Sequence, residues 1–210
     1  MANPLRGVSA DSAYLASVLG QTPGPIILVG HSYGGALISN TATGNENVVA
    51  LVFVAAFAPD EGEVLGQIEA GSKDSVLNSA LVPRQYPTGN GGSATEFYID
   101  PAKARDAFAG DVSDQQATLI AAVQRPVAEL AFGEPSGPPA WKEKPSWAVV
   151  ATGDKAAGTD VVRSMAERAG ANITEVEGSH VIMISRPDVV TDVIMEAVST
   201  ARSPVGSMGA

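Results

Sequence analysis

The chain contains 210 residues, of which 45% are hydrophobic and 17% are charged, and it carries a formal net charge of −10. This length is sufficient for one well-buried domain and short for two, and the composition is typical of a folded protein. Nucleic acid and anionic membranes would repel so acidic a chain, so neither is expected as a partner. Because the sequence has no cysteine, disulfides, thiolate metal sites and a cysteine nucleophile are excluded.

Targeting signals are not evident in the sequence. Its beginning lacks the basic and long apolar regions of a secretory signal, and no apolar run is long enough to cross a bilayer. Asn172-Ile173-Thr174 matches a glycosylation motif, but without secretion we interpret it as a chance match. The sequence therefore predicts a cytoplasmic protein.

Strand and helix patterns alternate near the two ends of the sequence. In chain order they predict a helix at Ser9–Leu19, a strand at Ile26–Val29, a helix from Ala36, a strand at Val48–Val54, a strand at Trp147–Val150, a helix at Val161–Ala169, a strand at Ile173–Val176 and a helix from Pro187. The strand Ile26–Val29 is short and apolar throughout, which is typical of a strand buried on both faces of a parallel sheet. We therefore predict an α/β fold, with a mostly parallel sheet and helices on both faces.

The middle of the sequence has a different character. Residues 59–145 contain nine of the fourteen prolines and no clear buried strand. We interpret this segment as an inserted, loosely helical cap. The alternative is a long disordered loop, which apolar side chains such as Phe97, Phe108 and Ile120 make less favourable. The predicted domains are thus a core of residues 1–58 and 146–202, a cap of residues 59–145 and a flexible tail of residues 203–210.

A glycine-rich turn follows the first predicted strand. Gly30-His31-Ser32-Tyr33-Gly34 fits the pattern G-x-S-x-G and lies between a strand and a helix, as a nucleophile elbow requires. The glycines two before and two after the serine remove side chains that would collide in so tight a turn, which presents the serine hydroxyl near a helix N-terminus. The alternatives are a turn with an ordinary serine, and a phosphate-binding loop, for which the lysine is missing. Ser32 is therefore the candidate nucleophile.

A serine nucleophile needs a base, and the sequence contains two histidines. His31 is adjacent to Ser32, and we expect it to pack beneath the turn. His180 follows the last predicted strand, where the base is expected if the chain order is serine, acid, histidine. Asp154 follows the preceding strand, at the edge where open α/β sheets form their sites, and is the predicted acid. Asp160 is the second choice, because it is better interpreted as a residue at the start of a helix.

Four stretches of the sequence resemble one superfamily. GHSYGG, VVALVFVAAFAPDEGE, WAVVATGDK and MAERAGANITEVEGSHVIMISRPDVV are similar to α/β-hydrolases, in particular to bacterial esterase-like members related to plant methylesterases and hydroxynitrile lyases. The resemblance covers essentially the whole chain, including a cap at residues 59–145. It implies the α/β-hydrolase fold and a catalytic triad of Ser32, Asp154 and His180. It is less specific for the reaction, because esterases, lactonases, C–C hydrolases, lyases and haloperoxidases share that triad.

The chain departs from this family near its beginning. Members normally have several strands before the elbow, one of them followed by a His-Gly turn that supplies half of the oxyanion hole, and this sequence has no His-Gly pair. We therefore expect the N-terminal strands to be absent. The backbone N–H of Tyr33 can provide one oxyanion donor, but the second has no evident source. The strand Ile26–Val29 would also have an open edge, so we expect a second copy to cover it in a homodimer or larger assembly.

The leading interpretation is a serine esterase that cleaves a small ester or related acyl substrate through an acyl-enzyme. The alternative within catalysis is a lyase or C–C hydrolase that uses the same triad, and the cap would decide between these reactions. The alternative outside catalysis is a binding module, favoured by the missing oxyanion strand and opposed by the complete triad. No cofactor is expected, and no metal, because neither histidine lies in a cluster of ligands.

Overall fold

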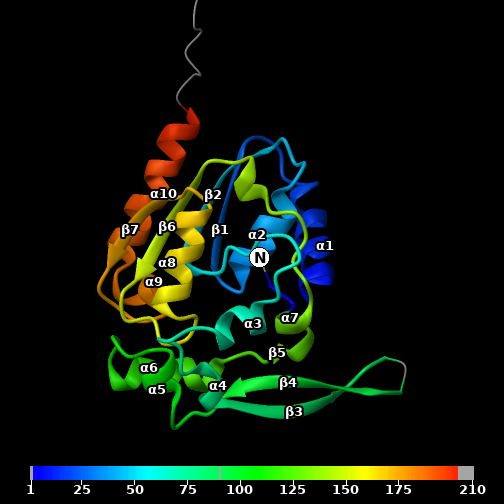
Figure 1. Cartoon of the computed structure of the whole chain (residues 1–210), viewed down its shortest axis with the longest axis vertical. Helices are drawn as coiled ribbons and strands as arrows, with labels where there is room; N and C mark the ends of the chain where they lie inside the picture. Colours follow the sequence, from blue (N-terminus) through cyan, green and yellow to red (C-terminus); the bar gives the residue numbers. More distant parts are fainter. Residues whose placement is uncertain (1, 90, 203–210) are drawn as a thin grey trace, which may run out of the picture.

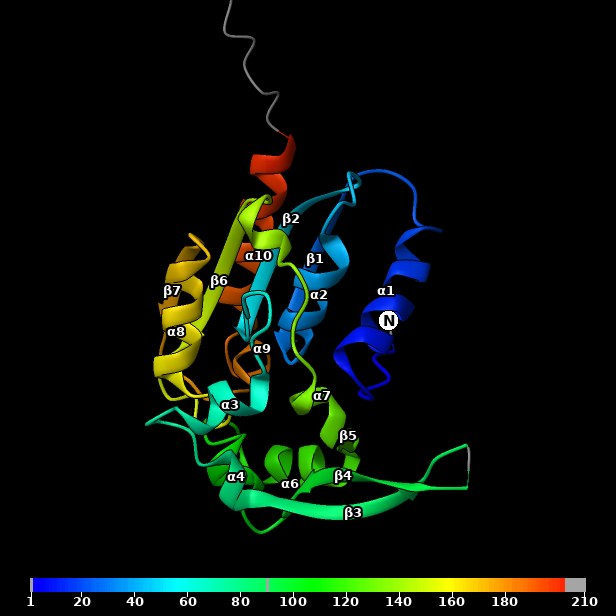
Figure 2. The ribbon, with the colours of Figure 1, turned by 45° about the vertical axis from the view of Figure 1, so that its right-hand side comes forward.

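A parallel sheet is the centre of the structure, a computed structural model that describes residues 2–89 and 91–202 (Figure 1). Its strands are β1 (Ile26–Ser32), β2 (Val48–Ala56), β6 (Ser146–Ala151) and β7 (Asn172–Val176). They lie in the order β1-β2-β6-β7, and each neighbouring pair is parallel. Figure 2 shows the four strands side by side in this order. The α/β architecture predicted from the sequence is therefore confirmed.

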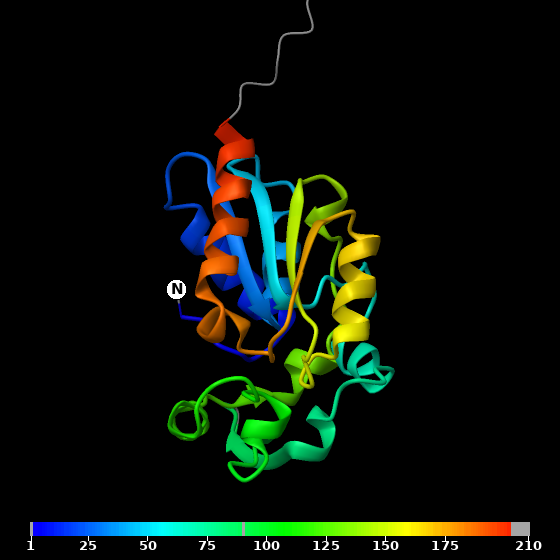
Figure 3. The same ribbon diagram turned by 90° about the vertical axis from the view of Figure 1, so that its left-hand side faces the viewer.

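Helices cover both faces of this sheet. The helices on one face are α1 (Val8–Leu19), α2 (Gly34–Ala42) and α8 (Thr159–Arg168), and those on the other are α9 (Ile182–Ser185) and α10 (Pro187–Arg202). Figure 3 shows α8 and α10 on opposite sides of the strands. Because side chains alternate along a strand, Leu51 and Phe53 of β2 pack with the first set, and Val52 and Val54 pack with the second. Full burial of each such side chain contributes about 1.5–3 kcal/mol, so β2 stabilises both layers at once.

Strands β1 and β2 both extend further than the predicted strands. Parallel pairing continues past the apolar run, with His31 opposite Val54 and Ser32 opposite Ala56. Backbone hydrogen bonding, rather than side-chain hydrophobicity, determines where these strands end. The candidate nucleophile is consequently the last residue of β1 rather than part of a loop.

The last described helix, α10, begins at Pro187 as predicted, since a proline suits the first turn of a helix. Its buried residues Val190, Val193 and Ala197 recur at the spacing of one helical face. The predicted tail of residues 203–210 lies outside the described residues. Within the part of the chain that the structure describes, no helix, α10 included, is long and apolar enough to cross a membrane.

The segment predicted as a cap, residues 59–145, lies beyond the carboxyl ends of the sheet strands (Figures 1 and 3). Its elements are α3 (Leu65–Ala70), α4 (Leu77–Ala80), β3 (Leu81–Pro87), β4 (Ser93–Ile99), α5 (Ala104–Ala107), α6 (Asp114–Val123), β5 (Val127–Ala128), α7 (Glu129–Gly133) and the 3-10 helix η1 (Ala140–Lys142). The predicted helices are present. The antiparallel sheet β3-β4-β5 is not predicted by the sequence pattern. Its strand β3 contains Pro83 and Pro87 and is largely exposed, so it lacks the apolar run that identifies the core strands.

Strand β1 lies at one edge of the parallel sheet that the structure describes. In the described residues, β2 is its one neighbour in the sheet. Val29, in the middle of β1, is 44% exposed. An apolar edge of this kind favours pairing with another strand, and the expected homodimer stays a prediction.

Candidate active site

Ser32 occupies a strained position between β1 and α2. It is the last residue of the strand, and Tyr33 is the N-cap of the helix. The φ angle of Ser32 is 54°, in the left-handed region that non-glycine residues rarely adopt. Such a conformation costs on the order of 1–3 kcal/mol and persists only where the surrounding structure enforces it. The backbone of this turn therefore has the strain expected of a nucleophile elbow.

Two glycines allow the tight approach of α2 to the sheet. A Cβ atom on Gly30 would lie 2.6 Å from the Gly34 carbonyl oxygen, and one on Gly35 would lie 2.2 Å from that of Phe57. A Cβ atom on Gly34 would meet no described atom within 4 Å apart from its chain neighbours and the backbone of its own helix. The sequence pattern names Gly30 and Gly34 as the small residues that the turn requires. The structure corrects the second of these to Gly35, because that residue faces the end of β2.

Asp154 and His180 form a buried pair after strands β6 and β7. His180 Nδ1 lies 2.8 Å from Asp154 Oδ2, and each side chain is 1% exposed. The second carboxylate oxygen, Oδ1, accepts hydrogen bonds from the backbone N–H groups of Ala156 and Ala157, at 2.9 and 3.0 Å. Burial raises the pKa of Asp154, but His180 and these hydrogen bonds outweigh burial, so the pKa lies below its ordinary value. A carboxylate can only accept hydrogen bonds, so Nδ1 of His180 carries the hydrogen and Nε2 is left as the basic nitrogen.

Asp160, the second choice for the acid, is placed elsewhere. It lies in the first turn of α8 and accepts hydrogen bonds from Ser72 Oγ at 2.5 Å and from the Lys73 backbone N–H at 2.9 Å. Its partners are thus residues of the cap. Of the two candidate acids, the structure brings Asp154 to His180.

His31, on β1, supports the segment of His180. Its Nε2 lies 2.9 Å from the His180 carbonyl oxygen, and the two imidazole ring centroids are 4.5 Å apart. Burial, together with the adjacent His180, lowers the pKa of His31 to about 3. Neutral His31 therefore donates its Nε2–H to the carbonyl. The expectation that this histidine packs beneath the turn is too simple, since it also lines the cavity described next.

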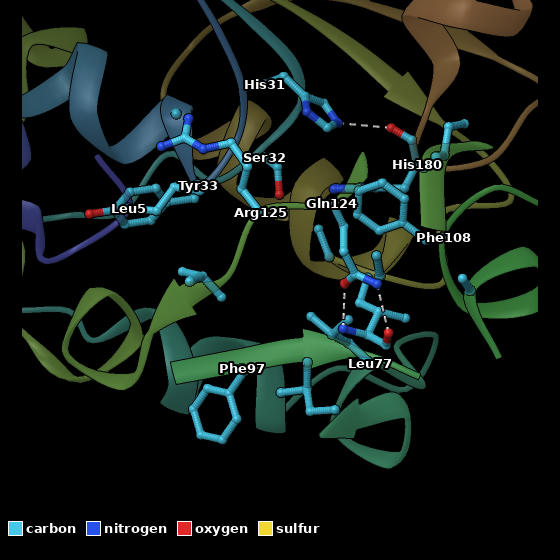
Figure 4. A pocket seen from close by; sticks show the side chains of 18 of the residues that line it. Leu5, His31, Ser32, Tyr33, Leu77, Phe97, Phe108, Gln124, Arg125 and His180 are labelled. Atoms are coloured by element: carbon cyan, nitrogen blue, oxygen red, sulfur yellow. Dashed lines mark hydrogen bonds between the residues drawn. The ribbon is translucent and has the colours of Figure 1, made fainter. Parts of the chain in front are cut away.

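One cavity of about 450 Å³ joins Ser32 and His180 to the cap. Figure 4 shows the Ser32 hydroxyl facing the side chains of His180 and Phe108. Most of the cap side of the wall is apolar, formed by Leu77, Leu81, Phe97, Ile99, Phe108 and Ile120. A cavity of this size and character can hold a small organic molecule. In residues 2–89 and 91–202, no group of three or more His, Asp or Glu side chains is arranged to hold a metal ion.

The cap contacts the His180 segment at two places that the sequence did not reveal. The ring of Phe108 meets the imidazole of His180 edge-on, with centroids 4.8 Å apart. Asp111 accepts hydrogen bonds from the hydroxyl of Ser179, and from that of Ser185 at 2.5 Å. Burial raises the pKa of Asp111, but the serine hydrogen bonds outweigh it and the pKa is lowered. Because His180 lies between the two serines, one cap carboxylate holds the segment on both sides of the histidine.

Tyr33, the predicted source of an oxyanion donor, is held by a buried carboxylate. Its hydroxyl donates to Asp11 Oδ2 at 3.0 Å, and the same oxygen accepts from the Arg6 N–H at 2.9 Å. The pKa of Tyr33 is raised mainly by burial and, to a smaller extent, by the nearby Asp11, so the hydroxyl stays protonated. Leu5 also lines the cavity, but its N–H already donates to Asn3 Oδ1 at 3.1 Å. The Leu5 N–H therefore already has an acceptor within its own segment.

The family of the chain follows from its sequence as well as its fold. The model of the alpha/beta hydrolase family matches residues 3–193. The chain therefore belongs to the α/β hydrolase family. This membership supports a hydrolase enzyme and agrees with the sheet, the strained serine and the buried Asp154–His180 pair.

Several solved structures share this fold. Polyneuridine aldehyde esterase has 20% sequence identity and a TM-score of 0.72, and the match covers 93% of this chain and 81% of that chain. A methylesterase from Arabidopsis has 19% identity and a TM-score of 0.73, with 94% and 80% covered. A pyrethroid hydrolase from Sphingobium faniae has 20% identity and a TM-score of 0.71, with 94% and 80% covered. At these identities the likeness establishes the fold. No curated protein is significantly similar in sequence.

Proposed function

We propose that the chain is a serine hydrolase that cleaves a small ester, or a related acyl substrate, through an acyl-enzyme on Ser32. The observation that carries this proposal is the buried hydrogen bond of 2.8 Å between His180 and Asp154, next to a strained serine in the same cavity. Burying a carboxylate and an imidazole costs solvation energy, and such pairs in clefts are concentrated at functional sites. The similarity in fold to an esterase and a methylesterase agrees with an acyl substrate.

In the proposed reaction the Ser32 hydroxyl oxygen attacks the ester carbonyl carbon while Nε2 of His180 takes its proton. Asp154 stabilises the resulting imidazolium. The negative charge on the carbonyl oxygen is stabilised by the Tyr33 N–H and by the N-terminal end of α2. The protonated His180 then gives its proton to the departing alcohol, and water releases the acid by the same steps. A site with one oxyanion donor is expected to be about 10²–10³ times slower than a site with two.

The test is hydrolysis of p-nitrophenyl butyrate by the wild type, Ser32→Ala and Ser17→Ala. Ser17 is an exposed serine on α1 whose hydroxyl donates to the Tyr14 carbonyl of its own helix, so it is a matched control. We expect p-nitrophenol release by the wild type and Ser17→Ala, and only the background rate with Ser32→Ala. Equal rates for the wild type and a folded Ser32→Ala protein would contradict the proposal.

We also propose that a second copy of the chain covers the open edge of β1. The proposal rests on the position of β1 at the sheet edge and on the exposure of Val29. Light scattering at micromolar concentration is expected to give twice the mass of one chain, and Val29→Lys is expected to reduce it to one chain. A wild-type monomer at that concentration would overturn this assembly and leave the esterase proposal unaffected.

A further inference from the structure

One positive charge in the cavity wall has no partner within the protein. Arg125, between α6 and β5, lines the cavity and forms no ion pair or hydrogen bond with any described residue. Two other polar side chains of the wall are already occupied. The side-chain amide of Gln124 donates a hydrogen bond to the Ile99 carbonyl at 2.9 Å and accepts one from the Ile99 backbone N–H at 2.7 Å. The side chain of Asn3 accepts a hydrogen bond from the Leu5 backbone N–H. Arg125 is thus the polar group of the cap wall that remains free for a ligand.

The other arginines show that this state is unusual for the chain. Five of them form ion pairs: Arg6 with Glu96, Arg105 with Asp114, Arg163 with Glu175, Arg168 with Glu63 and Arg186 with Asp188. Arg84 stacks over the ring of Tyr98. The chain has 23 acidic residues for 13 basic ones, so acidic partners are plentiful. Among the described residues, Arg125 and Arg202, which ends α10, are the arginines without a charged or aromatic partner.

The backbone on both sides of Arg125 is held in place. The side chain of Gln124 bridges both backbone groups of Ile99 on β4, and Pro126 restricts the backbone on the other side. Figure 4 shows the side chain of Arg125 reaching from this fixed point past Ser32, on the side of the cavity where Leu5 and Tyr33 lie. Arg125 is exposed to solvent and also lines the cavity.

We propose that Arg125 binds a carboxylate of the substrate, which makes the substrate an ester with an apolar body and one carboxylate group. This inference rests on the proposed function. A guanidinium matches a carboxylate in geometry and in charge, through two parallel N–H donors. One guanidinium balances the single negative charge of a carboxylate. The apolar residues of the cap would contact the hydrocarbon part of the molecule.

The first experiment measures charge selectivity in hydrolysis. The substrates are the p-nitrophenyl monoesters of succinate, adipate and suberate, each beside the neutral p-nitrophenyl ester of the same acyl length. The proteins are the wild type, Arg125→Met and the control Arg84→Met, which removes a cap arginine outside the cavity. We expect the ratio of kcat/KM for charged over neutral ester to fall about tenfold in Arg125→Met and to stay constant in Arg84→Met. An unchanged ratio in Arg125→Met would overturn the carboxylate site.

The second experiment does not depend on hydrolysis. Calorimetry measures binding of octanoate and of octanamide to Ser32→Ala and to Ser32→Ala/Arg125→Met. Octanoate is expected to bind Ser32→Ala about tenfold more tightly than the double variant, with no difference for octanamide. If octanoate binding depends on Arg125 but no ester is cleaved, the esterase proposal fails and the anion site stands. If esters are cleaved in a Ser32-dependent way but neither assay responds to Arg125, the anion site fails alone.

Discussion

The core and the cap contribute different kinds of side chain to the shared cavity. The core supplies Ser32, Asp154 and His180 at or after the carboxyl ends of its parallel strands, and the last two are almost completely buried. The cap supplies an apolar wall, the Asp111 contact and the exposed Arg125. Under the proposed function, the core would supply the reacting groups, and the cap would select the substrate and hold the His180 segment through Asp111. Substitutions in the core and in the cap test these roles.

The largest expected effect comes from the core pair. Asp154→Asn removes the carboxylate that holds His180 Nδ1–H, so the imidazole is free to present the wrong nitrogen to Ser32. We expect kcat for p-nitrophenyl butyrate to fall by about 10³–10⁴. Asp160→Asn, at the rejected position, is the control and is expected to keep its activity. A fully active Asp154→Asn protein would show that the pair is a structural feature of the core.

The second effect concerns the turn that carries Ser32. Gly35→Ala places a Cβ atom 2.2 Å from the Phe57 carbonyl oxygen, whereas Gly34→Ala meets no described atom within 4 Å apart from its chain neighbours and the backbone of its own helix. We expect Gly35→Ala to lower the free energy of unfolding by about 3 kcal/mol. Gly34→Ala is expected to change it by about 0.5 kcal/mol or less. Urea denaturation of both variants measures the difference, and equal midpoints would contradict the packing described for α2.

A smaller effect is expected where the cap contacts the core. Asp111→Asn weakens the two charge-assisted hydrogen bonds from Ser179 and Ser185, which hold the segment of His180. Because a small displacement of a catalytic group is costly, we expect kcat to fall about tenfold with little change in KM.

The control is Asp106→Asn, which removes a cap carboxylate that pairs with Lys155 at the surface. Steady-state kinetics of both variants separate kcat from KM. Equal kcat values for the wild type and Asp111→Asn would show that the core positions His180 without the cap.

The last effect is a pH dependence within the core. The pKa of His31 is about 3 in the folded protein and about 6.5 when unperturbed, so the unfolded chain binds the proton first. Its contribution to stability is complete above pH 6.5 and is lost as the pH falls towards 3, by at most about 1.4 kcal/mol per pH unit. His31→Gln keeps a donor for the His180 carbonyl but does not titrate. Urea denaturation between pH 7 and pH 4 should therefore give a shallower decline for His31→Gln than for the wild type, and parallel curves would contradict this account.

The sequence predicts the core well because its signals are local. Strands β1, β2 and β6 each contain a continuous apolar run, whereas β7 has the mixed sequence Asn-Ile-Thr-Glu-Val. Ser32, Asp154 and His180 each lie at or just after the end of a core strand. Parallel strands bring their carboxyl ends to one edge, so the order of residues along the chain is enough to predict that these groups are neighbours. The side-chain periodicity of α10 is equally local and predicts its buried face.

The cap is less predictable because its structure depends on contacts between distant residues. Strand β3 is interrupted by prolines and has little burial, and it is recognisable as a strand only through its pairing with β4. Asp111 lies 68 residues before Ser179, and no motif connects them. The role of Gly35 likewise depends on the distance to Phe57, which the sequence alone does not contain. Arg125 differs from Arg6, Arg84, Arg105, Arg163, Arg168 and Arg186 by lacking a partner, and that property exists only in the folded chain.

The most direct test of the central claim is covalent labelling of the nucleophile. Diethyl p-nitrophenyl phosphate transfers its diethylphosphoryl group to an activated serine as p-nitrophenolate leaves, and mass spectrometry of the peptides locates the group. We expect one adduct, on Ser32, which is absent from Ser32→Ala and forms much more slowly in His180→Ala. No adduct on the folded wild-type protein, or an adduct on another residue, would contradict the assignment of Ser32 as a nucleophile activated by the His180–Asp154 pair.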